Sequence, residues 1–130
     1  MAYLYPMAPT LERTKKVGNF DCVALVRHYA QVPVHFLWKA GEPVFGNANV
    51  KIGTAIATFV KGRYRNQPTG NHAAFFLRQQ PGGIWVIDQW KDPVRKPYVT
   101  AHFIPARGGP SKDGNWPLAS DNANAFFIIE

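Results

Sequence analysis

The most regular hydrophobic pattern in the chain is the run FDCVALVRHYAQV, from Phe20 to Val32. Asp21 can cap the start of a helix in this run, and Pro33 ends it. Four positions follow the i, i+3, i+4, i+7 spacing of one helical face: Cys22, Leu25, Val26 and Tyr29. The pattern therefore predicts an α-helix that begins beside the single cysteine of the chain.

A different pattern begins after Gly41, where short apolar runs rich in Ile, Val, Phe and Thr are separated by Gly, Pro and Asn. Such runs are typical of strands and turns. A short helix is expected before them, in part of Val34–Ala40. Five strands are predicted, at Gly53–Val60, His72–Arg78, Ile84–Trp90, Tyr98–Ile104 and Ala125–Glu130. One strong helix followed by five strands predicts an α+β fold.

The second and third predicted strands are joined by the segment QPGG, from Gln80 to Gly83. Glycine accepts the positive φ that tight hairpin turns need, so these two strands are expected to pair as an antiparallel hairpin. A long loop is predicted at Ala106–Asn124, which is rich in Gly, Pro, Asn and Asp. Long loops of this kind often border a functional cleft.

The composition indicates one globular domain that spans residues 1–130. The 46% hydrophobic content and 18% charged content argue against disorder, because such a chain can bury enough apolar surface to offset the entropy of folding. Lys and Arg total 15 against 8 Asp and Glu, a net charge of +7. This charge favours an anionic partner or substrate without identifying it.

The single cysteine excludes an intramolecular disulfide framework, a cysteine-cage zinc site and a CxxC redox pair. The chain has no HExxH motif and no Asp-rich loop, so neither a metal nor another cofactor is expected. The first ten residues, MAYLYPMAPT, lack a basic region followed by an apolar stretch, and no run reaches 18 apolar residues. We therefore expect synthesis in the cytoplasm without a signal peptide, and no membrane insertion.

Cys22 is the first candidate for chemistry. The thiolate is the reactive form of cysteine, and a position in the first turn of a helix lowers the pKa of a thiol, because unpaired N–H groups and the helix dipole favour the anion. The alternative is that Cys22 is one more apolar residue on the core face of its helix.

A nucleophilic cysteine needs a base, usually a histidine that a third polar group orients. His72 is the best candidate, because it opens a strand after a Gly-Asn turn and small residues follow it. His28 lies on another face of the helix, and His35 has no obvious polar neighbours. His102 is flanked by apolar residues within a strand and is expected to be structural.

The predicted hairpin supplies the third group, because its returning strand brings Asp88 or Gln89 level with His72. Which of the two shares the face of His72 depends on a one-residue register. Asp88 is favoured, since a carboxylate stabilises an imidazolium better than an amide does. A lone Asp among apolar neighbours also needs a polar partner.

The segments FDCVALV, GNHAAFFL and WVIDQW together resemble the papain-like cysteine hydrolases of the NlpC type and the related CHAP domains. The resemblance covers Gly18 to Trp90. It implies an N-terminal catalytic helix packed on a five-stranded, mostly antiparallel sheet. It also implies that Cys22 is the nucleophile and His72 the base, with Asp88 or Gln89 as the residue that orients the histidine.

The sequence departs from many NlpC-type members, which have a DCSG-like run and a second histidine as the third residue. This chain has DCVALV and an acidic or amide residue. It is therefore more similar to small, divergent bacterial amidases, including those that resemble type VI secretion effectors.

The resemblance implies a function as a peptidoglycan amidase or endopeptidase. Its substrate would be an amide bond of the stem peptides, such as a γ-D-Glu–diaminopimelate or a cross-link bond, cleaved through a thioester. The similarity to effectors also implies a cognate immunity protein and delivery to a periplasm or cell wall by a dedicated secretion system. The +7 charge suits an anionic cell wall.

Two non-catalytic alternatives remain on the sequence alone. One is a basic binding module for nucleic acid or a cell-wall polymer, since KGRYR (Lys61–Arg65) mixes basic and aromatic residues near Phe75 and Trp85. A solvated turn beside core aromatics explains the same residues better, so no nucleic acid partner is expected. The other is a papain-like fold without activity, in which Cys22 is buried and unreactive.

Overall fold

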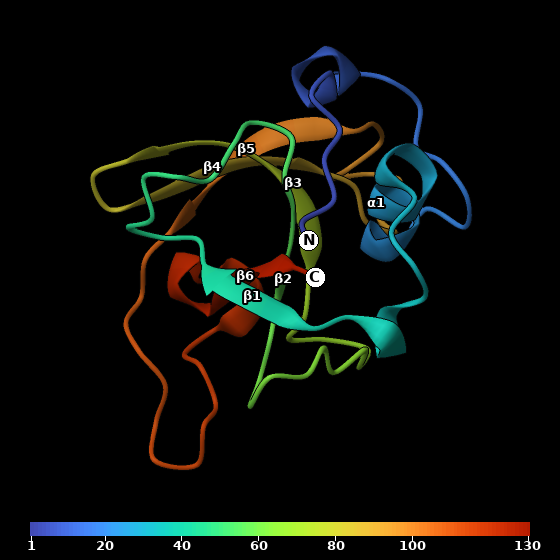
Figure 1. Ribbon diagram of the computed structural model, residues 1–130. Coiled ribbons are helices and arrows are strands. Elements are labelled where there is room, and N and C mark those ends of the chain that lie inside the picture. Colours follow the sequence, from blue (N-terminus) through green and yellow to red (C-terminus); the bar gives the residue numbers. More distant parts are fainter.

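The helix predicted around Cys22 packs against an antiparallel sheet in the computed structural model, which describes residues 1–130 (Figure 1). Helix α1 spans Cys22–Ala30. The Asp21 side chain accepts a hydrogen bond from the Ala24 N–H at 2.8 Å, which caps the start of the helix. Gln31 adopts the left-handed conformation at the other end, with φ of 57°, and ends the helix before Pro33.

The sheet has six strands in the order β1-β6-β2-β3-β4-β5, and each neighbouring pair is antiparallel. The strands are β1 (Ala40–Pro43), β2 (Ala55–Thr58), β3 (Ala73–Gln80), β4 (Gly83–Asp88), β5 (Thr100–Pro105) and β6 (Phe126–Ile129). The five predicted strands correspond to β2 to β6, and the α+β class is confirmed.

The prediction of five strands is wrong by one, because β1 adds a sixth strand at the edge of the sheet. Its sequence AGEP contains no β-branched or aromatic residue, so no strand pattern marks it. Backbone pairing with β6 forms this strand, with Ala40 opposite Ile129 and Pro43 opposite Phe127. Proline is tolerated there because an edge strand need not use every N–H group.

Four short 3₁₀ helices complete the chain: η1 (Ala8–Leu11), η2 (His35–Leu37), η3 (Ala119–Asp121) and η4 (Ala123–Ala125). Helix η2 lies within the short helix predicted at Val34–Ala40. The loop predicted at Ala106–Asn124 contains η3 and the start of η4. None of the helices is long and apolar enough to cross a lipid bilayer.

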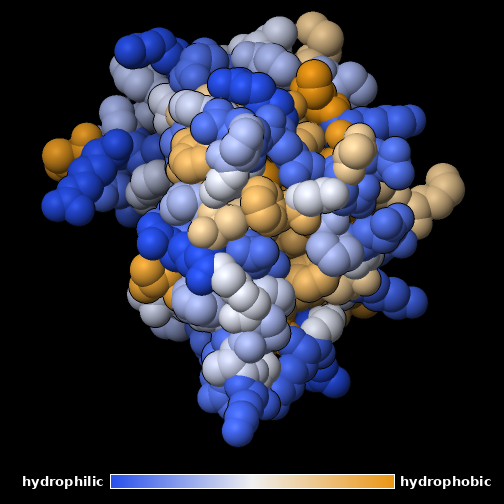
Figure 2. All heavy atoms as spheres, turned by 90° about the vertical axis from the view of Figure 1, so that its left-hand side faces the viewer, coloured by the Kyte–Doolittle hydropathy of each residue, from blue (hydrophilic) through white to orange (hydrophobic).

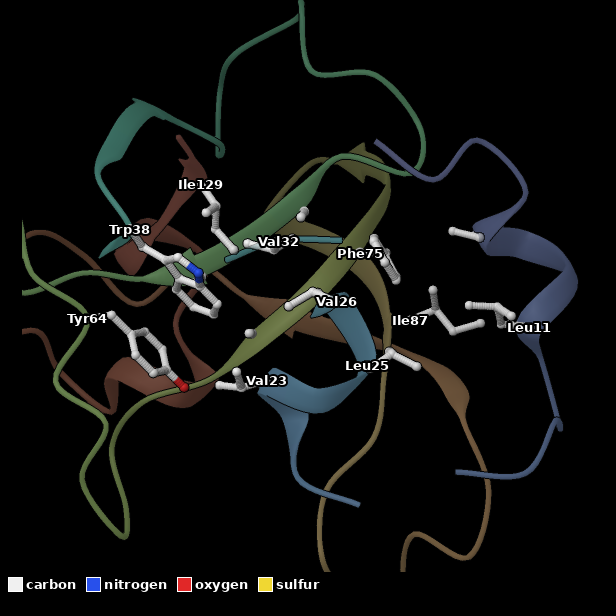
Figure 3. Packing of buried hydrophobic residues seen from close by; sticks show 14 of the residues in the cluster. Leu11, Val23, Leu25, Val26, Val32, Trp38, Tyr64, Phe75, Ile87 and Ile129 are labelled. Atoms are coloured by element: carbon white, nitrogen blue, oxygen red, sulfur yellow. The ribbon is translucent and has the colours of Figure 1, made fainter. Parts of the chain in front are cut away.

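The larger hydrophobic cluster fills the space between α1 and the sheet (Figure 3). Leu25 and Val26 of α1 pack with Phe75 of β3 and Ile87 of β4, and Leu11 of η1 closes one end of the cluster. These side chains are buried. Burial of α1 against β3 therefore fixes the position of the first turn of the helix, where Cys22 lies.

A second hydrophobic cluster lies on the opposite face of the sheet. It joins residues from strands that are far apart in the sheet order, such as Ile104 of β5 and Phe126 of β6, with Val44 directly after β1. The sheet is therefore curved around this cluster, and its concave face holds a core of its own (Figure 1).

A β-bulge at Leu77 interrupts the hairpin of β3 and β4. Close to the turn, Arg78 pairs with Trp85, whereas beyond the bulge Phe76 pairs with Val86. Because side chains alternate between faces, this shift of one residue reverses which residues of β4 share a face with a given residue of β3 on the far side of the bulge from the turn. The two-residue turn itself is the one predicted, with Gly82 at φ of 87°.

On the face of the molecule in Figure 2, hydrophilic residues surround hydrophobic ones that gather near the centre, and hydrophilic side chains interrupt the hydrophobic area. Several large hydrophobic residues are nevertheless exposed, among them Phe36 and Leu37 of η2 and Val94 in the β4–β5 connection. Scattered exposed hydrophobic residues are ordinary for globular proteins.

Candidate active site

Cys22 lies at the start of α1 and lines a cleft of about 300 Å³. Tyr64, His72 and Trp90 line the same cleft. The thiol is partly buried and is not sealed in the core. The alternative of a fully buried, inert cysteine therefore does not fit its position.

His72 precedes the first residue of β3, as the sequence pattern predicts. Its backbone N–H donates to the Thr58 side chain at 3.0 Å, and its carbonyl accepts from the Thr58 N–H at 2.9 Å, so β2 holds it in place. The imidazole is buried, and its Nε2 lies 2.6 Å from Oδ2 of Asp88. This leaves Nδ1 as the ring nitrogen that is available to Cys22.

Asp88 is the last residue of β4 and is fully buried. The bulge at Leu77 places it on the concave face together with His72. With the register that the turn sets, Gln89 would share that face instead, because the shift of one residue reverses the alternation. The bulge thus brings Asp88, and not Gln89, to the histidine.

Gln89 lies on the opposite face and has a different set of partners. Its amide oxygen accepts from the Val17 N–H at 3.0 Å, and its amide nitrogen donates to the carbonyls of Val17 and Asp21 at 3.0 and 2.8 Å. It forms no hydrogen bond with His72. Gln89 therefore ties β4 to the segment that leads into α1, and the structure does not place it as the residue that orients the histidine.

Cys22, His72 and Asp88 are electrostatically linked. Burial would lower the pKa of the His72 imidazole, but the negative charges of Asp88 and Cys22 outweigh this effect and raise its pKa to about 10. Burial would raise the pKa of Asp88, but the positive charge of His72 holds the pKa of the carboxyl well below its ordinary range.

The same balance operates at the thiol. Burial would raise the pKa of Cys22, but the positive charge of His72 and hydrogen bonds from His72 and Tyr64 outweigh it, so the pKa of the thiol is lowered. The Cys22 thiolate and the His72 imidazolium therefore stabilise each other. This arrangement suits nucleophilic attack at neutral pH.

Tyr64 is a site residue that the sequence did not reveal. The exposed basic residues around it fit the expected solvated turn, but its own ring is buried in the larger core cluster. Its hydroxyl lies 3.7 Å from Sγ of Cys22 and accepts from the Asn71 side chain at 3.4 Å, and in Figure 3 it points toward the first turn of α1. Burial and the negative charge of Cys22 raise the pKa of Tyr64, so it stays a phenol.

Two further side chains, Lys96 and His102, contact Asp88. The Lys96 ammonium lies 2.8 Å from Oδ1 of the carboxylate, and Nδ1 of His102 lies 3.3 Å from the same oxygen. Lys96 follows no pattern in the sequence. His102 was expected to be structural, yet it lines a hollow that adjoins His72 and Trp90. Its position two residues before Ile104, on the alternating pattern of β5, was the available signal that it points to the concave face.

The cluster does not resemble a metal centre. No three or more His, Cys, Asp or Glu side chains converge in a way that would hold a metal ion. At Asp88, the ammonium of Lys96 takes the position of a counter-ion, and its positive charge opposes the binding of a second cation there.

Comparisons with known proteins match almost the whole chain. A family model described as "Domesticated amidase effector 2" matches residues 7–129. A type VI secretion amidase effector 2 protein of Salmonella typhi is 50% identical over 133 aligned residues, which cover 100% of both chains. A solved structure of a type 6 secretion amidase effector 2 superposes with a TM-score of 0.95 at 50% identity, covering 98% of this chain and 94% of the other.

These findings confirm the resemblance to amidase effectors and the papain-like fold that the sequence indicated. They also confirm an enzyme of the amidase class, the class expected from the cysteine, histidine and acidic residues. The match extends over almost the whole chain rather than over the active-site segments alone. The chain therefore belongs to the amidase effector 2 family.

Proposed function

We propose that this protein hydrolyses an amide bond in the stem peptides of bacterial peptidoglycan, with Cys22 as nucleophile, His72 as acid and base, and Asp88 as the residue that orients His72. The observation that carries the proposal is the buried contact of 2.6 Å between His72 and Asp88, next to a thiol whose pKa is lowered. Membership of an amidase effector family supports the reaction class.

The first half of the reaction forms a thioester. The Cys22 thiolate attacks the amide carbonyl carbon, and a C–S bond forms as the carbonyl oxygen becomes an oxyanion. The C–N bond then breaks, and the His72 imidazolium gives its proton to the leaving amine. Asp88 keeps the imidazole oriented through Nε2, so that Nδ1 faces the reaction.

The second half releases the acyl group. Neutral His72 takes a proton from a water molecule, and the resulting hydroxide attacks the thioester carbonyl. The C–S bond breaks and the product leaves as a carboxylic acid. Cys22 returns as the thiolate and His72 as the imidazolium, which is the pair with which the cycle began.

The start of α1 supplies donors for the oxyanion. The first N–H groups of a helix have no intrahelical partner, and those of α1, including the N–H of Cys22, lie next to the thiol. The Tyr64 hydroxyl, 3.7 Å from Sγ, is a second donor at the same position. A single donor of this kind is worth on the order of 10²–10³ in kcat.

The cleft is extended, which suits a peptide rather than a compact small molecule. Toward α1 it shares Asp21, Val23 and Asn66 with a hollow of about 700 Å³. Toward η3 it shares His72 and Trp90, among others, with a third hollow of about 360 Å³. The thiol therefore lies partway along a groove that could hold residues on both sides of a cleaved bond.

The α1 arm of this groove carries positive charge. The charge is that of the Arg27 guanidinium, which forms no ion pair within the chain, whereas the Asp21 carboxylate that also lines this arm is engaged in capping α1. A carboxylate of the substrate peptide is the group that a guanidinium recognises best. Stem peptides carry such carboxylates, and this agrees with the net charge of +7.

The family description also supports a delivery route and a partner. Proteins named as type VI secretion effectors are similar to this chain over its full length. We infer that a type VI apparatus delivers the protein to the periplasm of a target cell, and that a cognate immunity protein protects the producing cell.

The test is digestion of purified peptidoglycan followed by muropeptide analysis. The wild type, Cys22→Ala and His72→Ala are compared with Arg78→Ala, a matched control whose side chain stacks on Trp85 at 4.7 Å, outside the cleft. We expect new products from the wild type and the control only. Equal products from Cys22→Ala, or an intact substrate with the wild type, would overturn the proposal.

A further inference from the structure

Lys96 is a charged residue that the proposed mechanism does not use, yet it is almost completely buried, with 3% of its surface exposed. Lysine is rarely buried unless its charge is paired. Its ammonium contacts Oδ1 of Asp88 at 2.8 Å and donates to the carbonyl and the hydroxyl of Thr100. It also lies over the ring of Trp90, 4.3 Å from the centroid. All the groups around the ammonium are suited to a cation.

The two oxygens of Asp88 have separate partners. Oδ2 faces Nε2 of His72 at 2.6 Å, whereas Oδ1 faces Lys96 at 2.8 Å and His102 at 3.3 Å. A carboxylate held at both oxygens cannot rotate about its side-chain bonds without losing a charged contact. The ion pair between Lys96 and Oδ1 therefore favours the orientation in which Oδ2 points at His72.

We propose that Lys96 is a positioning residue of the amidase reaction, which holds the Asp88 carboxylate ionised and with Oδ2 directed at His72. The inference rests on the proposed function of Cys22, His72 and Asp88. Lys96 lines none of the three hollows that form the groove, so it acts through Asp88 and not on the substrate.

The anchoring of Lys96 supports a positioning role. Thr100 is the first residue of β5 and lies opposite Asp88 in the β4–β5 pair, so both the carboxylate and the group that holds the ammonium belong to adjacent strands. Trp90, which covers the ammonium, also meets the ring of His72 edge-on at 5.9 Å between centroids. The lysine therefore belongs to the group of buried side chains that pack around the histidine.

Removal of the Lys96 charge has a defined electrostatic consequence. The groups that face Asp88 are His72, His102 and Lys96, and those that face Cys22 are His72 and Tyr64. Without the ammonium, the imidazolium of His72 loses a repulsive neighbour and the thiolate of Cys22 loses a distant attractive one. Both groups should then release their protons at higher pH.

The test is the pH profile of Cys22 alkylation by iodoacetamide, together with that of kcat/KM. Lys96→Met keeps most of the length of the side chain and its apolar stem but removes the charge, and Lys96→Arg keeps the charge. We expect Lys96→Met to move the acid limb, where Cys22 ionises, and the alkaline limb, where His72 loses its proton, to higher pH. We also expect kcat/KM at neutral pH to fall on the order of tenfold, the lower end of the range for residues that hold a directly acting group in place. Lys96→Arg should return the limbs toward the wild type.

Thr100→Val is a second variant, which keeps the ammonium but removes one of its acceptors. It should move the limbs in the same direction by a smaller amount, and it decides the matter if Lys96→Met does not fold. Unchanged limbs in the folded variants, with only a lower melting temperature, would overturn the proposal. Alkylation requires no peptidoglycan, so this outcome is distinct from a failure of the proposed substrate.

Discussion

Two carboxylates of this protein meet a cation at the same distance but in different surroundings. Oδ2 of Asp88 lies 2.6 Å from His72, and Oδ2 of Asp121 lies 2.6 Å from Arg107. The side chain of Asp88 is 0% exposed and that of Asp121 is 51% exposed. Water and salt screen the second pair, whereas the first is enclosed together with the ammonium of Lys96. The two pairs have the same contact distance, so it is burial that allows Asp88 to control the proton affinity of its partner, whereas Asp121 forms an ordinary surface ion pair.

Replacement of the buried carboxylate is the strongest way to break this comparison. Asp88→Asn keeps the shape but removes the charge that His72 and Lys96 share. We expect a loss in kcat on the order of 10⁴, the scale for an amide in place of a triad carboxylate, and a destabilisation of about 3–5 kcal/mol, because two buried cations lose their partner. Amidase kinetics and urea denaturation measure the two effects. A kcat within tenfold of the wild type would contradict the role of Asp88.

The pH dependence of stability tests the pairing of thiolate and imidazolium. Between pH 6.5 and 9.0, the ordinary values for His72 and Cys22, the unfolded chain keeps one proton of this pair, on Cys22, and the folded wild type, wherever its thiol is ionised, keeps one on His72. The proton counts are then equal, so His72 and Cys22 together add little pH dependence.

Cys22→Ala removes this compensation. Above pH 6.5 the unfolded variant loses the His72 proton while the folded variant retains it, because Asp88, the larger of the two negative charges that raise the folded pKa of His72, is still present. The free energy of unfolding of Cys22→Ala should therefore fall relative to the wild type as the pH rises from 6.5 to 9.0. Parallel curves from urea titrations across this range would show that no ion pair exists in the folded protein.

Gln89→Leu extends the comparison to a buried polar group that, unlike Asp88, carries no charge. It removes three hydrogen bonds to the backbone of Val17 and Asp21 and leaves these groups without a partner. We expect a loss of about 1–3 kcal/mol in the free energy of unfolding. The acid and alkaline limbs of the alkylation profile should stay in place, unlike those of Asp88→Asn. A shift of either limb would assign Gln89 a role at His72.

Arg27→Gln probes an exposed charge that lies in the groove. Because the guanidinium is open to solvent, we expect KM for a peptide with a free carboxylate in the α1 arm to rise only about threefold to fivefold, with kcat unchanged. The same peptide with that carboxylate amidated should show no difference between the variant and the wild type. Equal changes in KM for the two peptides would mean that Arg27 does not bind the carboxylate.

Asp121→Asn breaks the exposed pair and should have the smallest effect. We expect the free energy of unfolding to change by less than about 0.5 kcal/mol. The contact with Arg107 has the same length as the buried one, so the variant is a direct control for Asp88→Asn. A loss of unfolding free energy comparable to that of Asp88→Asn would contradict the view that burial makes the Asp88 pair stronger than the Asp121 pair.

The sequence predicted the parts of the site that local patterns determine. The cap at Asp21 placed Cys22 at the start of α1, and the QPGG turn placed β3 beside β4. Alternation along β4 narrowed the third residue to two neighbouring positions. These features depend on residues that are close in sequence, so a single chain was enough to infer them.

The remaining features depend on contacts that no local pattern records. The bulge at Leu77 decides between Asp88 and Gln89, and nothing in AAFFLRQQ marks it. Lys96 lies in the polar segment between β4 and β5, where the composition indicates a solvated loop, and only the β4–β5 register carries it to Asp88. Strand β1 likewise forms through its pairing with β6 at the far end of the chain.

The most direct test of the central claim is the titration of the Cys22 thiol, followed by the ultraviolet absorbance of the thiolate or by the alkylation rate. In the wild type we expect the thiolate to form below pH 9.0, the ordinary value for a cysteine, because His72 stabilises it. In His72→Ala, where burial acts without the compensating charge, the thiolate should form at or above that value. Identical titrations for the two proteins would contradict the account.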